Sequence, residues 1–168
     1  MAGLDLPTSG TVTLLGSQIT ILDEDKRAQI RGKDVGFVFQ SFHLMPRLTA
    51  LDNVMLPLEI SGDPYSMDKA QEALKQVGLS KRAKHFATQL SGGEKQRVAI
   101  ARSIVNKPKI LFADEPTGNL DKKSSGSITD LLFSLNELIN TTLVLVTHDL
   151  SLAEKCDEVY ELAEGRLL

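Results

Sequence analysis

The sequence has 168 residues, of which 42% are hydrophobic and 24% are charged, a composition ordinary for one globular domain. Its net charge of -3 argues against a general nucleic-acid-binding protein, and its single cysteine, Cys156, excludes an internal disulfide. No stretch approaches the roughly 20 apolar residues that a membrane-spanning helix needs. We therefore expect one domain, residues 1–168, that lies in the cytoplasm or against a membrane protein.

The first third of the chain predicts short elements. Met1 to Asp5 has the pattern of a helix end, because Gly3 suits the position after a helix and Pro7 cannot continue one. Gly10 to Gly16 encloses Thr-Val-Thr-Leu-Leu, whose β-branched residues predict a strand. Asp23 to Arg31 predicts a short, charged helix.

A buried strand is predicted over Val35 to Phe39, and it ends at Gln40. An irregular segment follows, because Pro46 prevents a regular helix. This segment carries three large apolar side chains: Phe42, Leu44 and Met45. They either contact a partner or form a local core under the helices that come next.

Residues of roughly 41–90 predict a helical insertion. Within it, Leu51 to Pro57 predicts a helix that ends at the proline, and Gly62 to Pro64 predicts a turn. Ser66 is the predicted N-cap of a second helix, which Gly78 closes. The apolar residues on one face of this helix are Met67, Ala70, Leu74 and Val77.

A possible anion site comes next. Leu90 to Arg97 reads Leu-Ser-Gly-Gly-Glu-Lys-Gln-Arg and runs into a helical pattern from Glu94 to Asn106. Ser91, Gly92 and Gly93 are therefore expected at a helix N-terminus, where unpaired N–H groups and the helix dipole attract anions. The two glycines allow a phosphate to approach the backbone closely. The alternative is a simple turn with Ser91 as a helix cap.

Two more apolar strands end in polar groups. Ile110 to Glu115 ends in two carboxylates, and Thr142 to Thr147 delivers His148. Ligands of open parallel sheets bind beyond the C-terminal ends of the strands, so these groups are expected near Gln40 at one sheet edge. An aspartate at a strand end can hold Mg²⁺ on a nucleotide, and an adjacent glutamate can polarise an attacking water.

The last third predicts helices and a hairpin. Asp121 precedes a helix with apolar residues at helical spacing from Ile128 to Ile139. Asp121 can cap this helix, belong to the nucleotide site, or do both. Asp149 to Lys155 predicts a short helix, and Val159 to Leu168 predicts a terminal hairpin.

This ordered set of motifs resembles that of the ATP-binding subunits of ABC transporters over nearly the whole chain. The sequences of the motifs are most similar to those of the LolD/MacB branch. The resemblance implies an α/β, P-loop NTPase-like fold with a mostly parallel sheet and a helical insertion, and an ATP hydrolase that uses ATP and Mg²⁺. By the same resemblance, Glu115 would be the general base, His148 would contact the γ-phosphate, and Gln40 with Asp114 would manage Mg²⁺. The remaining nucleotide-binding positions would be Ser91, Gly92, Gly93 and Asp121.

The resemblance also implies partners. Two copies would associate head to tail as a homodimer, and a separate membrane-spanning subunit would be contacted through Phe42, Leu44 and Met45. The protein would then lie on the cytoplasmic side of the inner membrane and power export or lipoprotein release. Substrate choice would belong to the membrane subunit. The alternative is a non-hydrolytic docking protein that binds the membrane subunit.

The printed residues contain no Gly-x-x-x-x-Gly-Lys-Ser/Thr loop, the Walker A motif that wraps nucleotide phosphates. In the family, a sequence like that of residues 2–10 lies at the end of the helix that begins at this loop. We therefore expect an N-terminally truncated fold that is inactive alone. We also expect ATP binding too weak to measure, since the loop would supply several bonds to the phosphates.

Overall fold

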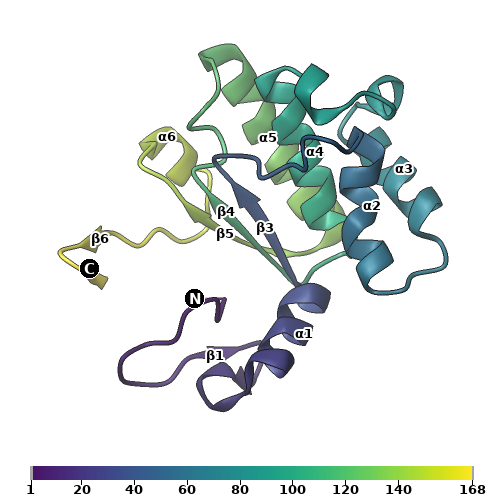
Figure 1. Ribbon diagram of the computed structural model, residues 1–168. Helices are drawn as coiled ribbons and strands as arrows, with labels where there is room; N and C mark the ends of the chain where they lie inside the picture. Colours follow the sequence, from purple (N-terminus) through teal and green to yellow (C-terminus); the bar gives the residue numbers. More distant parts are fainter. Residues whose placement is uncertain (1, 168) are drawn as a thin grey trace.

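The computed structural model describes residues 2–167, and a three-stranded parallel sheet forms its centre (Figure 1). The strands β3 (Val35–Phe39), β4 (Ile110–Asp114) and β5 (Thr142–Val146) lie side by side in that order. The three predicted strands and the mostly parallel α/β architecture are thus confirmed. Because the strands are parallel, their C-terminal ends meet at one edge of the sheet.

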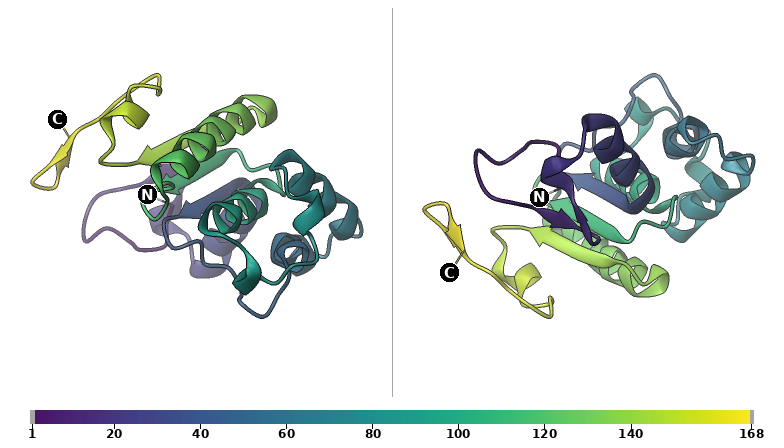
Figure 2. Two further views of the ribbon diagram at one scale, coloured as in Figure 1. Left: turned by 90° about the horizontal axis from the view of Figure 1, so that it is seen from above. Right: turned by 90° about the horizontal axis from the view of Figure 1, so that it is seen from below.

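The helices α4 (Gly92–Ile104) and α5 (Lys122–Ile139) pack on one face of this sheet (Figure 2). Both helices were predicted from their apolar spacing, and their buried residues join those of the sheet in the main core. α4 can approach β3 closely because residue 36 is glycine. A Cβ at Gly36 would lie 2.4 Å from the carbonyl oxygen of Ser103.

Beside α4 lie the helices α2 (Ala50–Ile60) and α3 (Ser66–Gln76) and the 3-10 turns η2 (Ser80–Arg82) and η3 (Ala87–Gln89) (Figure 1). α2 begins with a capping box, in which the side chains of Thr49 and Asp52 each accept a bond from the other residue's backbone. The backbone of residues 83–87 bonds to that of residues 48–51, which ties this helical part together.

Two predictions in this helical part are wrong. α2 continues through Pro57 to Ile60, because the burial of Val54 and Leu58 offsets the hydrogen bond that a proline cannot make. Ser66 is not an N-cap, since it already belongs to α3 and Tyr65 stands at the cap position without a side-chain bond. The predicted closure by Gly78 is confirmed by its φ of 76°.

The N-terminal part forms a second, smaller core against the other face of the sheet. It contains the short hairpin β1 (Thr13–Leu14) and β2 (Ser17–Gln18), the turn η1 (Ile19–Ile21) and the helix α1 (Glu24–Asp34). The predicted strand is therefore only two residues long, and the predicted charged helix extends three residues further. The buried residues of this core are Ala2, Leu14, Ile19 and Val35.

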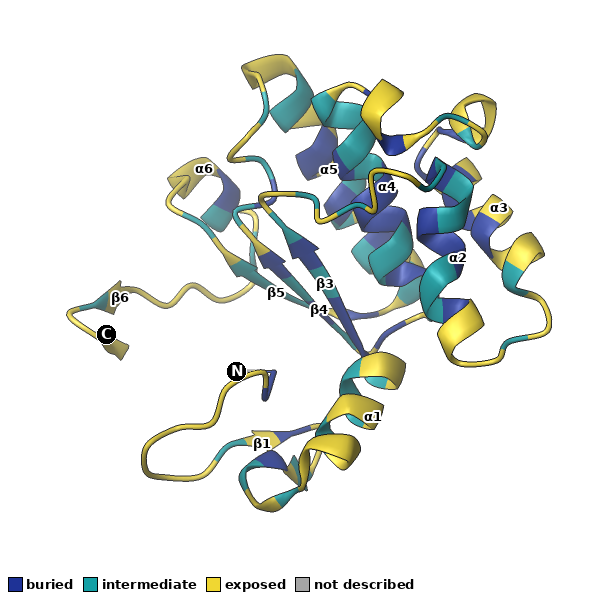
Figure 3. Ribbon diagram, in the orientation of Figure 1, coloured by how far each residue is buried: buried dark blue, intermediate teal, exposed yellow. Residues whose placement is uncertain are grey.

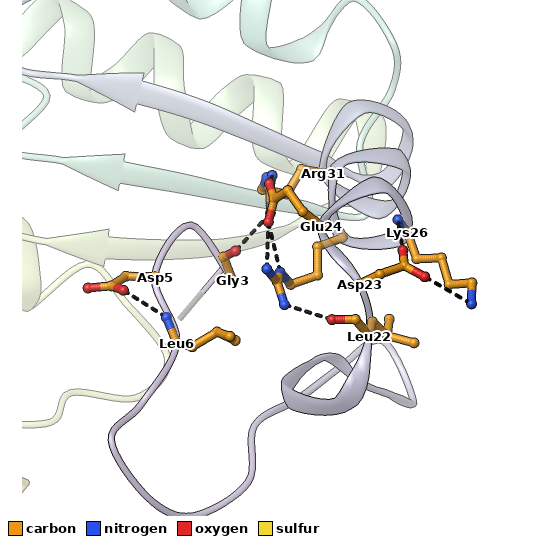
Figure 4. Close-up of polar contacts among 9 residues, drawn as sticks. Gly3, Asp5, Leu6, Leu22, Asp23, Glu24, Lys26 and Arg31 are labelled. Atoms are coloured by element: carbon orange, nitrogen blue, oxygen red, sulfur yellow. Dashed lines mark hydrogen bonds and ion pairs between the residues drawn. The ribbon is translucent and has the colours of Figure 1, made fainter.

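Polar bonds hold this N-terminal part together (Figure 4). Asp23 caps α1 by accepting a bond from the N–H of Lys26 at 2.8 Å. Arg31 donates to the carbonyl oxygen of Gly3 at 2.8 Å and pairs with Glu24. Residues 2–5 contain no helix, although Gly3 has the positive φ, 69°, that a glycine after a helix adopts. Met1 lies outside the described residues.

The C-terminal part is more exposed than the centre (Figure 3). It contains α6 (Leu150–Ala153), shorter than predicted, and a hairpin of β6 (Leu162–Ala163) and β7 (Arg166–Leu167). The first strand of this hairpin starts three residues later than predicted, and Leu168 lies outside the described residues. No helix within residues 2–167 has both the length and the apolar content to cross a membrane.

Candidate nucleotide site

Glu115 has an unusual backbone at the end of β4. Its φ is 44°, a left-handed conformation that is unfavourable for a residue other than glycine. Its N–H still bonds to the carbonyl oxygen of Val146 at 2.9 Å, which extends the pairing of β4 and β5 by one residue. The change of φ therefore redirects the side chain at the point where the strand ends.

The redirected side chain of Glu115 meets His148, which follows β5. Oε1 of Glu115 lies 2.6 Å from Nδ1 of His148 and accepts a bond from the backbone N–H of His148 at 2.9 Å. The other carboxylate oxygen lies 3.4 Å from the hydroxyl of Thr147. The two residues predicted from separate strand ends thus form one bonded pair.

Gln40, at the end of β3, is bonded to the loop after β4. Its side-chain nitrogen donates to Oδ1 of Asn119 at 3.3 Å, and Nδ2 of Asn119 donates to the Gln40 carbonyl oxygen at 3.0 Å. Residue 118 must be small for this contact, since a Cβ at Gly118 would lie 2.6 Å from the Gln40 side-chain nitrogen. Asn119 was not predicted as a site residue, and only its place in the loop after the strand-end carboxylates pointed to it.

Asp114 and Gln40 lie at the ends of neighbouring strands. Phe39 of β3 pairs with Asp114 of β4, and Gln40 is the residue after Phe39. Asp114 is exposed, and its carboxylate has no hydrogen bond or ion pair within residues 2–167. No group of three His, Cys, Asp or Glu side chains in this described part could hold a metal ion by itself. One free carboxylate and one amide oxygen fit Mg²⁺, which takes one or two protein oxygens and completes its shell with phosphate and water.

Ser91 stands at the N-cap of α4, as one of the two predicted alternatives requires. Its hydroxyl accepts a bond from the N–H of Glu94 at 3.3 Å, and its own N–H donates to Glu94 at 2.9 Å. The hydroxyl proton of Ser91 remains free to donate. The N–H groups of Gly92 and Gly93 have no partner within the described residues, so α4 begins with unpaired donors.

The charge of Glu94 beside these donors is balanced. Nε of Arg82 donates to Oε1 of Glu94 at 2.9 Å. The bond from the Ser91 backbone, with smaller contributions from the Ser91 side chain and Arg82, lowers the pKa of Glu94 below its usual range. The first turn of α4 therefore carries a carboxylate that is already bonded, beside two free N–H groups.

Asp121 caps α5 and also lies near the start of α4. Its carboxylate accepts bonds from the N–H of Lys123 and the N–H and hydroxyl of Ser124. The hydroxyl bond from Ser124, then its backbone bond, lowers the pKa of Asp121. A Cβ at Gly93 would lie 3.5 Å from the Ser124 side chain, so the two helix N-termini are neighbours. The predicted cap role of Asp121 is confirmed, and its predicted place in the nucleotide site stays a prediction, which its position beside Gly93 permits.

The predicted residues thus form two groups. Gln40, Asp114, Glu115 and His148 share the sheet edge, whereas Ser91, Gly92, Gly93 and Asp121 share the N-termini of α4 and α5. Gln96, which was not predicted, connects them: it is fully buried in α4 and donates to the carbonyl oxygen of Pro116 at 2.6 Å.

The three apolar residues after Gln40 differ in their environment. Leu44 is half-buried and packs against the main core, as the local-core alternative requires. Met45 is 49% exposed, and Phe42 is half-buried. The segment is therefore anchored by Leu44 and presents Met45 on the surface.

The comparisons with known proteins agree with this geometry. The family model described as "ABC transporter" matches residues 1–118. This chain belongs to the ABC transporter family. The uncharacterized ABC transporter ATP-binding protein YbbA of Escherichia coli (strain K12) is 53% identical over 169 aligned residues, which cover 99% of this chain and 74% of YbbA.

Two further matches define the branch and the fold. The lipoprotein-releasing system ATP-binding protein LolD of Xanthomonas campestris pv. campestris (strain 8004) is 47% identical, over 99% of this chain and 71% of LolD. The dimeric ATP-binding cassette MJ0796, solved in a post-hydrolysis state with ADP and Pi, superposes with a TM-score of 0.80 at 44% identity, over 90% of this chain and 68% of MJ0796. This ABC transporter chain is thus an ATP-binding subunit of the LolD and YbbA type, and its family is one of ATP hydrolases that dimerise and work with membrane subunits.

Proposed function

We propose that this chain powers export or lipoprotein release by hydrolysing Mg-ATP for a separate membrane-spanning subunit, on the cytoplasmic side of the inner membrane. The observation that carries the proposal is the bonded pair of Glu115 and His148 beside Asp114 and Gln40. These four side chains come from the ends of three parallel strands, where nucleotide sites of this fold class lie.

Glu115 acts as the general base or as the group that orients the attacking water. His148 holds Oε1 through its Nδ1–H and backbone N–H, and Oε2, which lies 3.4 Å from the Thr147 hydroxyl, keeps lone pairs that can accept a proton from water. Nε2 of His148 faces away from Glu115, and it can donate to the γ-phosphate when both ring nitrogens are protonated. One histidine would thus position both the base and the phosphate it acts on.

Asp114 and the side-chain oxygen of Gln40 would hold Mg²⁺. The ion, when bound, neutralises charge on the β- and γ-phosphates. Asp114 has the free carboxylate for this task, and Gln40 already lies beside it at the neighbouring strand end. Gln40 is fixed through Asn119, which keeps its nitrogen bonded elsewhere and leaves its oxygen free as a ligand.

Ser91, Gly92 and Gly93 would bind the γ-phosphate of a nucleotide held mainly by a second copy of the chain. Their support is the set of unused donors at the start of α4: one hydroxyl proton and two backbone N–H groups. Asp121 would lie at the same junction, next to Gly93. This arrangement requires a head-to-tail homodimer.

The membrane subunit would contact the segment after Gln40. Met45 and Phe42 offer apolar surface there, and Leu44 fixes the segment to the main core. Residues of roughly 41–90 would form the helical subdomain beside this contact. The nature of the cargo belongs to the membrane subunit.

The test is a Glu115→Gln substitution in a fusion that carries a Walker A loop ahead of residue 2. The glutamine keeps the shape of the side chain and removes its basicity, so we expect turnover to fall by roughly 10²- to 10⁴-fold while the ATP-bound dimer accumulates. Glu161→Gln is the matched control, because Glu161 is exposed and makes no hydrogen bond within the described residues. If the unsubstituted fusion binds the membrane subunit yet never hydrolyses ATP, the docking protein is the better description.

A further inference from the structure

The segment after Gln40 contains a turn of unfavourable backbone conformation. Phe42 and His43 have φ angles of 60° and 48°, although neither is glycine. Two successive residues of this kind are rare, because the Cβ of an L-amino acid crowds the backbone there. The surrounding structure must therefore stabilise this turn.

The stabilising bonds come from α4. Nη1 of Arg102 donates to the carbonyl oxygen of His43 at 2.7 Å, and Nη2 donates to that of Phe42 at 2.9 Å. The carbonyl oxygens of Phe42 and His43 are thus two neighbouring acceptors of one guanidinium. The planar fork of a guanidinium matches two such acceptors, whereas the single ammonium of a lysine does not.

Arg102 makes these bonds without an acidic partner. It is half-buried, and within residues 2–167 no carboxylate forms an ion pair with it. Burial lowers the pKa of Arg102 below its usual value. A cation taken out of water needs compensating contacts, and here the two carbonyl oxygens of the turn provide them. Arg102 is thus committed to the turn after Gln40.

The same helix contacts the nucleotide groups at two other places. Ser91 caps its N-terminus, and Gln96 donates to the carbonyl oxygen of Pro116, the residue after Glu115. Ser91 and Arg102 lie about 16 Å apart along the helix axis. α4 is therefore one continuous element that joins the start of the glycine motif to the turn after Gln40.

We propose that Arg102 is a positioning residue that fixes the turn after Gln40 to α4, so that Gln40 and the Ser91–Gly93 motif keep one relative position. The proposal rests on the nucleotide roles proposed above for Gln40 and Ser91. Without the guanidinium, the turn loses the bonds that compensate its backbone strain and relaxes. Gln40 then keeps its bonds to Asn119 but loses the attachment of the following turn to α4, while Glu115, His148 and the glycine motif are untouched.

The first test is amide hydrogen exchange by NMR on the chain as it stands, without nucleotide. The N–H groups of Phe42 and His43 bond within the turn, to Phe39 and Ser41, so their exchange reports on it. We expect Arg102→Ala to raise their exchange about tenfold or more, with much smaller changes in β4, and Arg102→Lys to give an intermediate increase. Arg97→Ala is the matched control, because Arg97 donates from the same helix to a different carbonyl oxygen, that of Val77, at 3.0 Å.

Exchange at Phe42 and His43 that is unchanged in Arg102→Ala, or that rises only in step with β4, would overturn the proposal. A second test uses the Walker A fusion and separates kcat from KM. Arg102→Ala is expected to lower kcat by roughly 10- to 100-fold with little change in KM, since the phosphate contacts remain. An unchanged kcat would also overturn it. A fusion without any ATPase activity would instead count against the proposed function, and the exchange experiment would still decide the role of Arg102.

Discussion

His148 uses both its backbone N–H and its ring to hold one oxygen of Glu115: the N–H lies 2.9 Å and Nδ1 lies 2.6 Å from Oε1. A carboxylate held by two donors at one oxygen keeps a defined orientation. Because Glu115 also has a left-handed φ of 44°, its position is determined from both the backbone and the side chain. The position of Glu115 relative to His148 is therefore fixed by contacts within the chain itself.

Substitutions of His148 test which ring nitrogen matters. His148→Ala should lower ATP turnover of the Walker A fusion by roughly 10²-fold, because Glu115 loses the ring and keeps only the backbone N–H and the more distant hydroxyl of Thr147. His148→Asn places an amide nitrogen near the position of Nδ1 and should recover part of the loss. His148→Gln places it near Nε2 instead. Steady-state kcat decides: if glutamine restores turnover and asparagine does not, the contact with the γ-phosphate matters more than the bond to Glu115.

The strands and the placement of the site at one edge followed from the sequence. The apolar, β-branched runs before Gln40, Asp114 and His148 have few alternatives to buried strands, and parallel strands bring their ends together. The cap at Asp121 could also be predicted, because an aspartate directly before a helical pattern can accept bonds from the first N–H groups of that helix. Local signals of this kind do not depend on the rest of the chain.

Features that depend on contacts between residues distant in the sequence could not be predicted from the sequence. Pro57 looks like a helix end, but α2 continues because its neighbours are buried against α3 and α4. The hydrogen bond between Gln40 and Asn119 joins residues that are far apart in the sequence, and their spacing does not predict it. The left-handed turn at Phe42 and His43 is likewise bonded to a distant residue, Arg102 of α4.

Gly118→Ala should displace Gln40. A methyl group at this position would lie 2.6 Å from the Gln40 side-chain nitrogen, so that side chain must leave Asn119. We expect a changed NMR shift of the Gln40 side-chain amide and a lower ATPase rate in the Walker A fusion. The cost in folding free energy should be small, because the displaced atoms end a flexible side chain.

Gly126→Ala is the matched control for this substitution. Gly126 lies within α5, and nothing lies within 4 Å of the position its Cβ would take. The alanine should stabilise the protein by roughly 0.5–1 kcal/mol through its higher helix propensity, without altering ATPase activity. Urea unfolding of both variants makes the comparison. A Gly118→Ala variant with an unmoved Gln40 amide and full activity would show that this contact is not needed.

Leu44 and Met45 should respond differently to serine. Leu44→Ser removes a half-buried side chain from the main core and should cost about 1–3 kcal/mol of folding free energy. Met45→Ser, at a 49% exposed position, should change stability by less than about 0.5 kcal/mol. Urea unfolding gives both values. Binding to detergent-solubilised membrane subunit that co-purifies with the protein should then weaken in Met45→Ser; unaltered binding would move the proposed contact elsewhere.

The cap of α5 should make part of the stability depend on pH. The hydroxyl and backbone bonds from Ser124 lower the pKa of Asp121 in the folded protein, so the folded state favours the ionised carboxylate. Stability from this charge is fully present above the pKa of the unfolded aspartate, about 3.9, and is lost as the pH falls through the lower folded pKa.

Asp121→Asn tests this dependence, because asparagine keeps a capping side chain without a titrating group. We therefore expect the urea midpoint of the unsubstituted chain to exceed that of Asp121→Asn at pH 7, and the gap to close as the pH falls toward 3. Asp121→Ala removes the cap altogether, and its deficit relative to Asp121→Asn should stay constant over the same range. A gap between the unsubstituted chain and Asp121→Asn that persists unchanged in acid would show that the charge of Asp121 does not stabilise α5.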